Sequence, residues 1–207
     1  MTIATPVLDA HRKRITATLT EFISALGPAQ VLVIGPGEGW TMRALRDAGR
    51  LVRGVELDAD RVRTCTERGL EVGHGDGASL EDEDSSVDVV LLRNVLSCAE
   101  DPAAVAAEAW RVARRCVVLA EPEYLDALPS QAMMEWLDAL ADELRFAQGV
   151  PSLHPLDAGE MLALLPEKPT AVEVRSFGLL TSAPPDEIDA IVAAAVGDGE
   201  LSETQRA

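Results

Sequence analysis

The sequence predicts an α/β fold with a doubly wound, mostly parallel sheet and helices on both faces. Short apolar runs alternate with segments of helical periodicity through the first 121 residues, which is typical of strands joined by crossover helices. The runs at 31–34 and 87–92 are apolar throughout, as expected of strands buried on both faces. A chain of 207 residues can bury one substantial core, so we expect a single domain over 1–207.

The first half of the chain divides at glycines and prolines. Apolar residues recur at helical spacing up to Leu26, and Gly27-Pro28 then ends that helix. The expected elements are a helix at 8–26, a strand at 31–34, a helix at 41–48, a strand at 51–56, a helix from Ala59 to before Gly69, and a weak strand near 70–74.

The second half begins with an acidic segment, "EDEDSS" at 81–86, which we interpret as a solvated loop. Asp101 and Pro102 then have the chemistry of a helix cap and a first helical residue. The expected elements are strands at 87–92, 116–121 and 171–182, and helices at 101–113, near 133–144, at 159–165 and near 185–196.

Charge and cysteine usage exclude several classes of protein. The formal net charge is −17, which repels phosphate backbones and anionic membrane surfaces. Among nucleic-acid functions, only binding of a specific RNA through a small basic patch is compatible with this charge. Three cysteines stand far apart without CxxC spacing, which argues against a disulfide framework and a zinc site. No signal core and no apolar run of about 18 residues is found. We therefore expect a cytoplasmic protein with no membrane span and no metal.

The stretch "VLVIGPGEGW" at 31–40 is the first candidate site. Glycines at 35, 37 and 39 follow an apolar strand and precede a helix. Such a turn lets the backbone approach a ligand closely, and the helix start favours an anion. The spacing G-x-G-x-G followed by Trp40 departs from the dinucleotide pattern. A tight structural turn without a ligand is the alternative.

Acidic residues end the next two strands. Glu56 closes the strand at 51–56 and could accept both hydroxyls of a ribose. Asp58 fits better as the cap of the following helix. Asp76, in "HGDG" at 74–77, could accept an adenine amine, or it could form an Asx turn. Because these residues follow successive parallel strands, we expect them along one edge of the sheet.

With these features the sequence resembles the class I S-adenosylmethionine-dependent methyltransferases, which have a Rossmann-like fold. The segments that carry the resemblance are "VLVIGPGEG", "GVELDADRV", "HGDGASL" and "VDVVLLRNVLSCAEDPAAVAAEAWRVARRCVVLAEP", within residues 30–122. The resemblance implies S-adenosyl-L-methionine as the cofactor and 30–122 as the cofactor-binding core. It implies the cofactor contacts Gly35, Pro36 and Gly37 under the methionine part, Glu56 on the ribose, Leu57, Asp76 and Gly77 at the adenine, and Arg93 and Asn94 near the sulfonium.

The sequence departs from the family pattern at several places. Val33 stands where many members have an acid, two residues before the first glycine, and Ser97-Cys98 stands where many have a histidine pair. The loop before the fifth strand is trimmed to "ARRC", and only one strand of the usual C-terminal hairpin is recognisable, at 171–182.

Residues 123–170 are expected to form acceptor-side helices. Tyr124 and His154 are weak candidates for a catalytic base. The acidic surface favours a small-molecule acceptor over nucleic acid, and a homodimer stays open. Two alternatives to a methyltransferase are a catalytically inactive cofactor-binding or scaffold protein of the same fold and a nicotinamide-dependent oxidoreductase, which the glycine spacing opposes.

Overall fold

The structure is a computed structural model that describes residues 6–27, 29–121 and 156–175. The chain divides into two compact units. The first comprises residues 1–122 and 156–178, and the second comprises 123–155 and 179–207. The second unit lies wholly outside the described residues, so the single domain over 1–207 and the helices near 133–144 and 185–196 stay predictions. Among the described residues, no helix combines the length and apolar character needed to cross a membrane.

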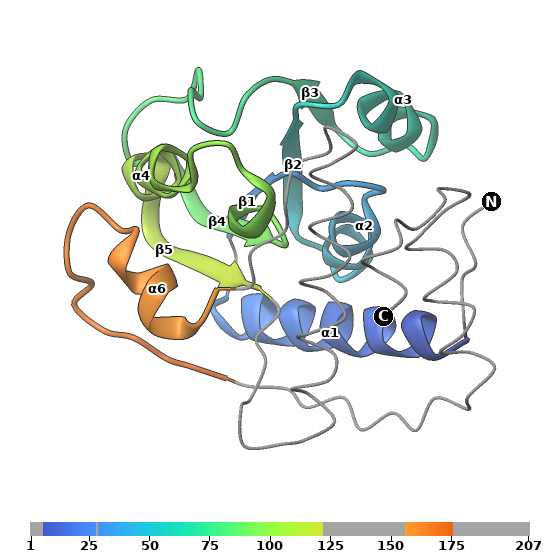
Figure 1. Cartoon of the computed structure of the whole chain (residues 1–207). Helices are drawn as coiled ribbons and strands as arrows, with labels where there is room; N and C mark the ends of the chain where they lie inside the picture. Colours follow the sequence, from blue (N-terminus) through green and yellow to red (C-terminus); the bar gives the residue numbers. More distant parts are fainter. Residues whose placement is uncertain (1–5, 28, 122–155, 176–207) are drawn as a thin grey trace, which may run out of the picture. The chain divides into compact units, whose positions relative to one another are not determined.

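Five parallel strands form one sheet, in the order β3-β2-β1-β4-β5 (Figure 1). The bounds are β1 Gln30–Ile34, β2 Leu51–Glu56, β3 Val72–His74, β4 Val87–Arg93 and β5 Ala113–Ala120. Strand β1 is central and pairs in parallel with β2 on one side and β4 on the other. The chain thus winds outward from β1 in both directions, which confirms the doubly wound sheet.

Helices cover both faces of this sheet. Helix α4 begins as predicted, because the Asp101 side chain accepts a hydrogen bond from the Ala104 N–H at 2.9 Å and Pro102 is its first residue. The helices are α1 Pro6–Ala25, α2 Trp40–Asp47, α3 Ala59–Glu67, the 3₁₀ turn η1 Leu96–Cys98, α4 Pro102–Val112 and α6 Ala158–Ala163. All helices predicted within the described residues are therefore confirmed, with ends shifted by a few residues.

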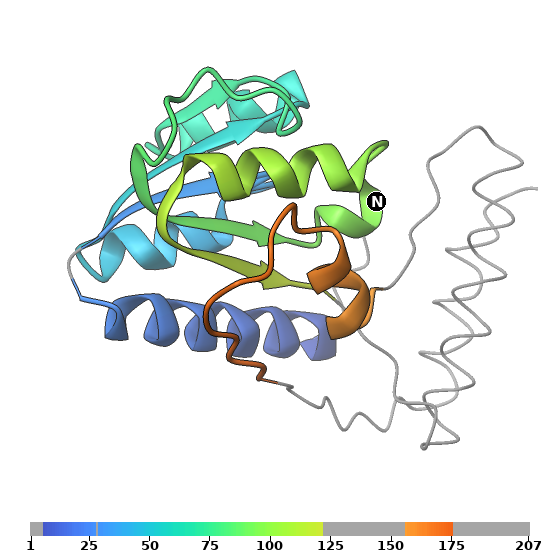
Figure 2. The same cartoon turned by 90° about the vertical axis from the view of Figure 1, so that its left-hand side faces the viewer.

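Alternate residues of the central strands pack into two separate hydrophobic cores, one on each face of the sheet. Val33 and Leu91 pack in one core with residues of α1, α2 and α3. Leu32 and Leu92 pack in the other core with residues of α4 and, at its margin, α6. Figures 1 and 2 show α1 and α2 on one side of the sheet and α4 on the other. This alternation explains why β1 and β4 read as continuous apolar runs.

Two strand predictions need correction. Strand β5 begins at Ala113, not at 116, because helix α4 leads directly into it and Ala113 already pairs with Val87. The "ARRC" segment is therefore the start of the strand, not a trimmed turn. Residues 171–175, the described part of the strand predicted at 171–182, are irregular and exposed. They pair with no strand among the described residues, and residues 176–182 of the predicted strand lie outside that part of the chain.

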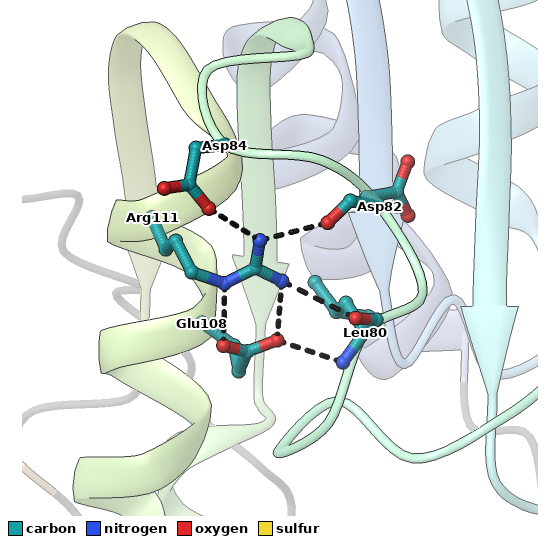
Figure 3. A network of polar contacts seen from close by, with 5 residues as sticks. All are labelled: Leu80, Asp82, Asp84, Glu108 and Arg111. Carbon is teal, nitrogen blue, oxygen red and sulfur yellow. Dashed lines mark hydrogen bonds and ion pairs between the residues drawn. The ribbon is translucent and has the colours of Figure 1, made fainter.

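The acidic segment at 81–86 is a largely exposed loop before β4, as predicted, and it is also held to the body of the protein by ion pairs and hydrogen bonds. Figure 3 shows Arg111 of α4 reaching into this loop. Its guanidinium donates to both Glu108 carboxylate oxygens at 2.7 Å, to Asp84 Oδ1 at 2.8 Å, to the Asp82 carbonyl at 2.7 Å and to the Leu80 carbonyl at 3.2 Å. These bonds occupy all five guanidinium N–H groups. The Asp82 carboxylate in turn pairs with Arg53 of β2. Hydrogen bonding to Glu108 and Asp84 raises the pKa of Arg111, and the same Arg111 contact lowers the pKa of Glu108.

We expect Arg111→Lys to destabilise the protein, because an ammonium keeps the charge but cannot make five bonds in one plane. The Arg111 side chain is 31% exposed, so the expected loss in the free energy of unfolding is about 1–2 kcal/mol. Urea denaturation followed by circular dichroism measures it. The matched control is Arg43→Lys. The ion pair between Arg43 and Asp47 is largely exposed, so this substitution should change the free energy of unfolding by less than about 0.5 kcal/mol. Equal losses in the two variants would contradict this account of the network.

Candidate functional site

The carboxyl ends of the parallel strands gather the predicted site residues at one edge of the sheet. The turn from Gly35 to Gly39 follows β1, and Glu56 is the last residue of β2. Asp76 lies in the loop after β3, while Arg93 ends β4. The pairing of β1 with β2 and β4 makes the first, second and fourth of these segments neighbours, as expected for a ligand site in an open α/β fold.

Glu56 is buried and joins the second strand to the glycine turn. Its side chain is only 5% exposed. Carboxylate Oε2 accepts the Gly37 N–H at 2.9 Å, and Oε1 accepts the Asp58 N–H at 3.1 Å. A carboxylate can accept about four hydrogen bonds, so each oxygen keeps capacity for one more donor. The neighbouring Leu57 side chain is 65% exposed and offers an apolar surface beside this carboxylate.

The three glycines of the turn have different surroundings although all have a positive φ, which favours glycine. A Cβ on Gly35 would approach Val95 Cγ2 to 2.7 Å, and one on Gly39 would approach Leu70 Cδ1 to 2.3 Å. A Cβ on Gly37 would meet nothing within 4 Å. Gly35 and Gly39 are therefore required by packing within the protein. Gly37 alone faces open space, where a ligand could approach the backbone.

The two other acidic candidates make local hydrogen bonds. Asp58 caps α3 and accepts the Asp60 and Arg61 N–H groups at 2.8 and 3.2 Å, as the sequence favours. These backbone bonds are the main cause that lowers the pKa of Asp58. Asp76 accepts the Ala78 N–H at 2.9 Å, which is the Asx-turn arrangement, and its side chain is exposed. Gly77 packs closely, because a Cβ there would lie 2.5 Å from Ile34 Cγ2.

Arg93 ends β4 and Asn94 follows it, but the two side chains differ in environment. Arg93 is half-buried, and its Nη1 donates to the Thr16 and Thr41 hydroxyls, both at 2.9 Å. Asn94 is exposed, has a φ of 53° and donates its backbone N–H to the Ala120 carbonyl at 2.9 Å. The sequence places both residues at the correct strand end. It does not show that Arg93 turns toward helices α1 and α2.

Glu121 has a positioning role that the sequence leaves open, because an acid after the fifth strand can either orient a neighbouring group or cap the next turn. Its Oε1 accepts the Val95 and Leu96 N–H groups at 2.8 and 2.9 Å, and its Oε2 accepts the Ser97 hydroxyl at 2.7 Å. Glu121 thereby fixes the loop between β4 and η1, whose Val95 packs beside Gly35. The only signal in the sequence is an acid directly after a strand, which also occurs in ordinary turns.

Other candidates contribute less. Cys98 is exposed, and its thiol lies 3.5 Å from the Asn94 carbonyl. In the part of the chain that the structure describes, no three His, Cys, Asp or Glu side chains gather into a group that could hold a metal ion. Tyr124 and His154 lie outside the described residues, so their role as a base stays a prediction.

Comparison with solved structures shows a methyltransferase fold. A SAM-dependent methyltransferase from Thermotoga maritima superposes with a TM-score of 0.56 at 18% identity, over 72% of this chain and 68% of that protein. A methyltransferase candidate from Bacillus halodurans gives 0.54 at 18%, over 72% and 65%. A chain from a Haloferax volcanii complex of the Trm112 methyltransferase activator with a methyltransferase candidate gives 0.50 at 20%, over 66% and 58%. At these identities the likeness shows the fold alone.

Comparison by sequence identifies the family. No curated protein matches the chain. The family model described as "Methionine biosynthesis protein MetW" matches residues 16–124, which include β1 to β5 and all the site segments described above. With more than half of its length matched, this chain belongs to the MetW family and has the fold of the class I S-adenosylmethionine-dependent methyltransferases.

Proposed function

We propose that this protein is an S-adenosyl-L-methionine-dependent methyltransferase that acts on a small-molecule acceptor. The observation that carries the proposal is the hydrogen bond from the Gly37 N–H to Glu56 Oε2 at 2.9 Å. It joins the two segments that a nucleoside cofactor would contact, the glycine turn and the acid at the end of β2. The family and the fold support the same activity.

The residues present fit the cofactor. Gly37 leaves open space above the backbone, as a closely approaching ligand requires. Glu56 keeps one acceptor position on each oxygen for the two ribose hydroxyls. Leu57 exposes an apolar side chain for the adenine ring. We place Gly35, Pro36, Gly37, Glu56, Leu57, Asp76, Gly77, Arg93 and Asn94 around the cofactor, with Asp76 and Gly77 at the adenine end.

The protein's own contribution is binding and alignment. The cofactor supplies a methyl group already activated by a positively charged sulfur. Glu56 and the glycine turn fix the nucleoside, while Glu121 fixes the β4–η1 loop beside it. Holding an acceptor atom in line with the sulfur–methyl bond lowers the barrier through proximity and orientation. A base is needed only for an acceptor that must lose a proton, and Tyr124 and His154 remain candidates for that role.

A small acceptor is favoured by charge and by family. The net charge of −17 disfavours polyanionic acceptors such as nucleic acid. The family's description, methionine biosynthesis, also belongs to small-molecule metabolism. We keep the cytoplasm as the expected compartment and a homodimer as an open assembly.

Glu56→Gln tests the ribose contact. We expect it to weaken S-adenosylhomocysteine binding by about 2–4 kcal/mol, or about 30- to 1,000-fold, because the hydroxyls lose charged acceptors. Isothermal titration calorimetry measures the affinity. The matched control is Asp58→Asn, which removes the same charge two residues away but keeps a good helix cap. It should bind as wild type does.

The titration separates the rival functions. No binding to the folded wild type would overturn the cofactor site. Tight binding with no methyl transfer to broad panels of small acceptors would favour the inactive scaffold.

Glycine substitutions separate the ligand-facing glycine from the packing glycine. Gly39→Ala forces a Cβ into Leu70 and should cost roughly 2–4 kcal/mol of stability. Gly37→Ala should lose only about 1–2 kcal/mol of stability, because its backbone has a positive φ. It should nevertheless lose most of its affinity for S-adenosylhomocysteine, because the new Cβ occupies the space through which the ligand approaches the backbone. Thermal melts measure the stability of both variants, and calorimetry measures their affinity for S-adenosylhomocysteine. A folded Gly37→Ala protein with unchanged affinity would show that no ligand approaches there.

A further inference from the structure

Arg93 presents a guanidinium to the α1–α2 side of the sheet edge. Strand alternation sets its direction, because Val89 and Leu91 of the same strand belong to the core on that side. The two threonines that it contacts come from both helices of that face, Thr16 from α1 and Thr41 from the first turn of α2. The group therefore lies directly beside the glycine turn, which precedes α2.

No carboxylate pairs with Arg93 among the described residues. Its two hydrogen bonds to described residues both come from Nη1 and go to neutral hydroxyls. Its Nε and Nη2 groups have no hydrogen-bond partner in the same part of the chain. Half-buried arginines normally have an anionic partner. The remaining Nε–H and Nη2–H form a fork that matches the two oxygens of a carboxylate.

The surroundings of Arg93 strengthen its attraction for an anion. Burial is the main cause that lowers the pKa of Arg93, and the nearby positive charge of Arg12 adds to the effect. Helix α2 is preceded by Gly39, which provides no side-chain cap, so the first N–H groups of the helix also present a positive dipole end to this region. The Thr41 hydroxyl accepts from Arg93 and retains a proton of its own to donate.

We propose that Arg93, with the hydroxyls of Thr16 and Thr41, forms a subsite for a ligand carboxylate at the edge of the sheet. The inference rests on the proposed function and names the substrate chemistry of that site. Two ligands could supply the carboxylate: the amino-acid end of the cofactor, or an acceptor that is itself a carboxylic acid. The same guanidinium fork would bind either one.

The experiment compares ligands that differ in the carboxylate. Calorimetry measures the affinities of S-adenosylhomocysteine and of 5′-methylthioadenosine, which lacks the amino-acid end. Both ligands are titrated into the wild type, Arg93→Met, Arg93→Lys and Thr41→Val. Acetate is then titrated into free and S-adenosylhomocysteine-saturated protein, with the Arg93 side-chain resonance in the NMR spectrum as the readout. Melting curves check that each variant folds. We expect Arg93→Met to fold, because it removes a half-buried charge and leaves no charged partner among the described residues without its counter-charge.

Each source of the carboxylate gives its own result. If it is the cofactor, Arg93→Met weakens S-adenosylhomocysteine about 10- to 100-fold and leaves 5′-methylthioadenosine unchanged; Arg93→Lys and Thr41→Val lose less. If it is the acceptor, both nucleosides bind Arg93→Met normally, and acetate shifts the Arg93 resonance in the saturated wild type.

Two results would overturn the subsite. One is an equal loss of both nucleosides in Arg93→Met, which would indicate a merely structural role. The other is no dependence on Arg93 for either nucleoside together with no response to acetate. If neither nucleoside binds the wild type, the proposed function fails. The acetate titration of the free protein then decides the subsite by itself.

Discussion

The parallel pairing of β1 with both β2 and β4 is the constraint on which the rest of the structure depends. It places the chain segments that leave these strands at one edge of the sheet. Val31 to Ile34 are at most 2% exposed, so the interior has no room for polar chemistry between the helices. The glycine turn, Glu56 and Arg93 can only act where the strands end, and there they become neighbours.

Hydrogen bonds from both sides then fix the glycine turn. On the β2 side, Gly35 donates to the Val55 carbonyl at 2.9 Å and Gly37 donates to Glu56. On the β4 side, Glu121 holds the loop that places Val95 against Gly35. A turn held by two neighbouring strands has little freedom left to lose when a ligand binds. Preorganisation of this kind suits the proposed methyltransferase, in which the protein's main contribution would be alignment.

The sequence predicts the parts of this site that depend on local order. Strand ends, the glycine turn, Glu56 and the Asp58 cap follow from short patterns, because each depends on residues near it in the chain. The partners of Glu121 and the direction of Arg93 do not follow from the sequence, because the groups that they contact lie 24 to 26 and 52 to 77 residues away. The early start of β5 depends on pairing with β4, which α4 separates from it. Asp76 has two local interpretations, and the hydrogen bond from the Ala78 N–H to its carboxylate shows that the Asx turn is formed.

Val33 brings no acid to the face of the sheet from which Arg93 projects. Val33 pairs with Leu91, two residues before Arg93, and is 2% exposed in the α1–α2 core; the related methyltransferases that the sequence resembles often have an acid at this position. A buried carboxylate there would cost several kcal/mol alone, but Arg93 would offset part of that cost. We therefore expect Val33→Asp to destabilise Arg93→Met more than wild type, with a coupling of about 1–3 kcal/mol in a double-mutant cycle measured by urea denaturation. Additive losses would show that the two positions do not interact.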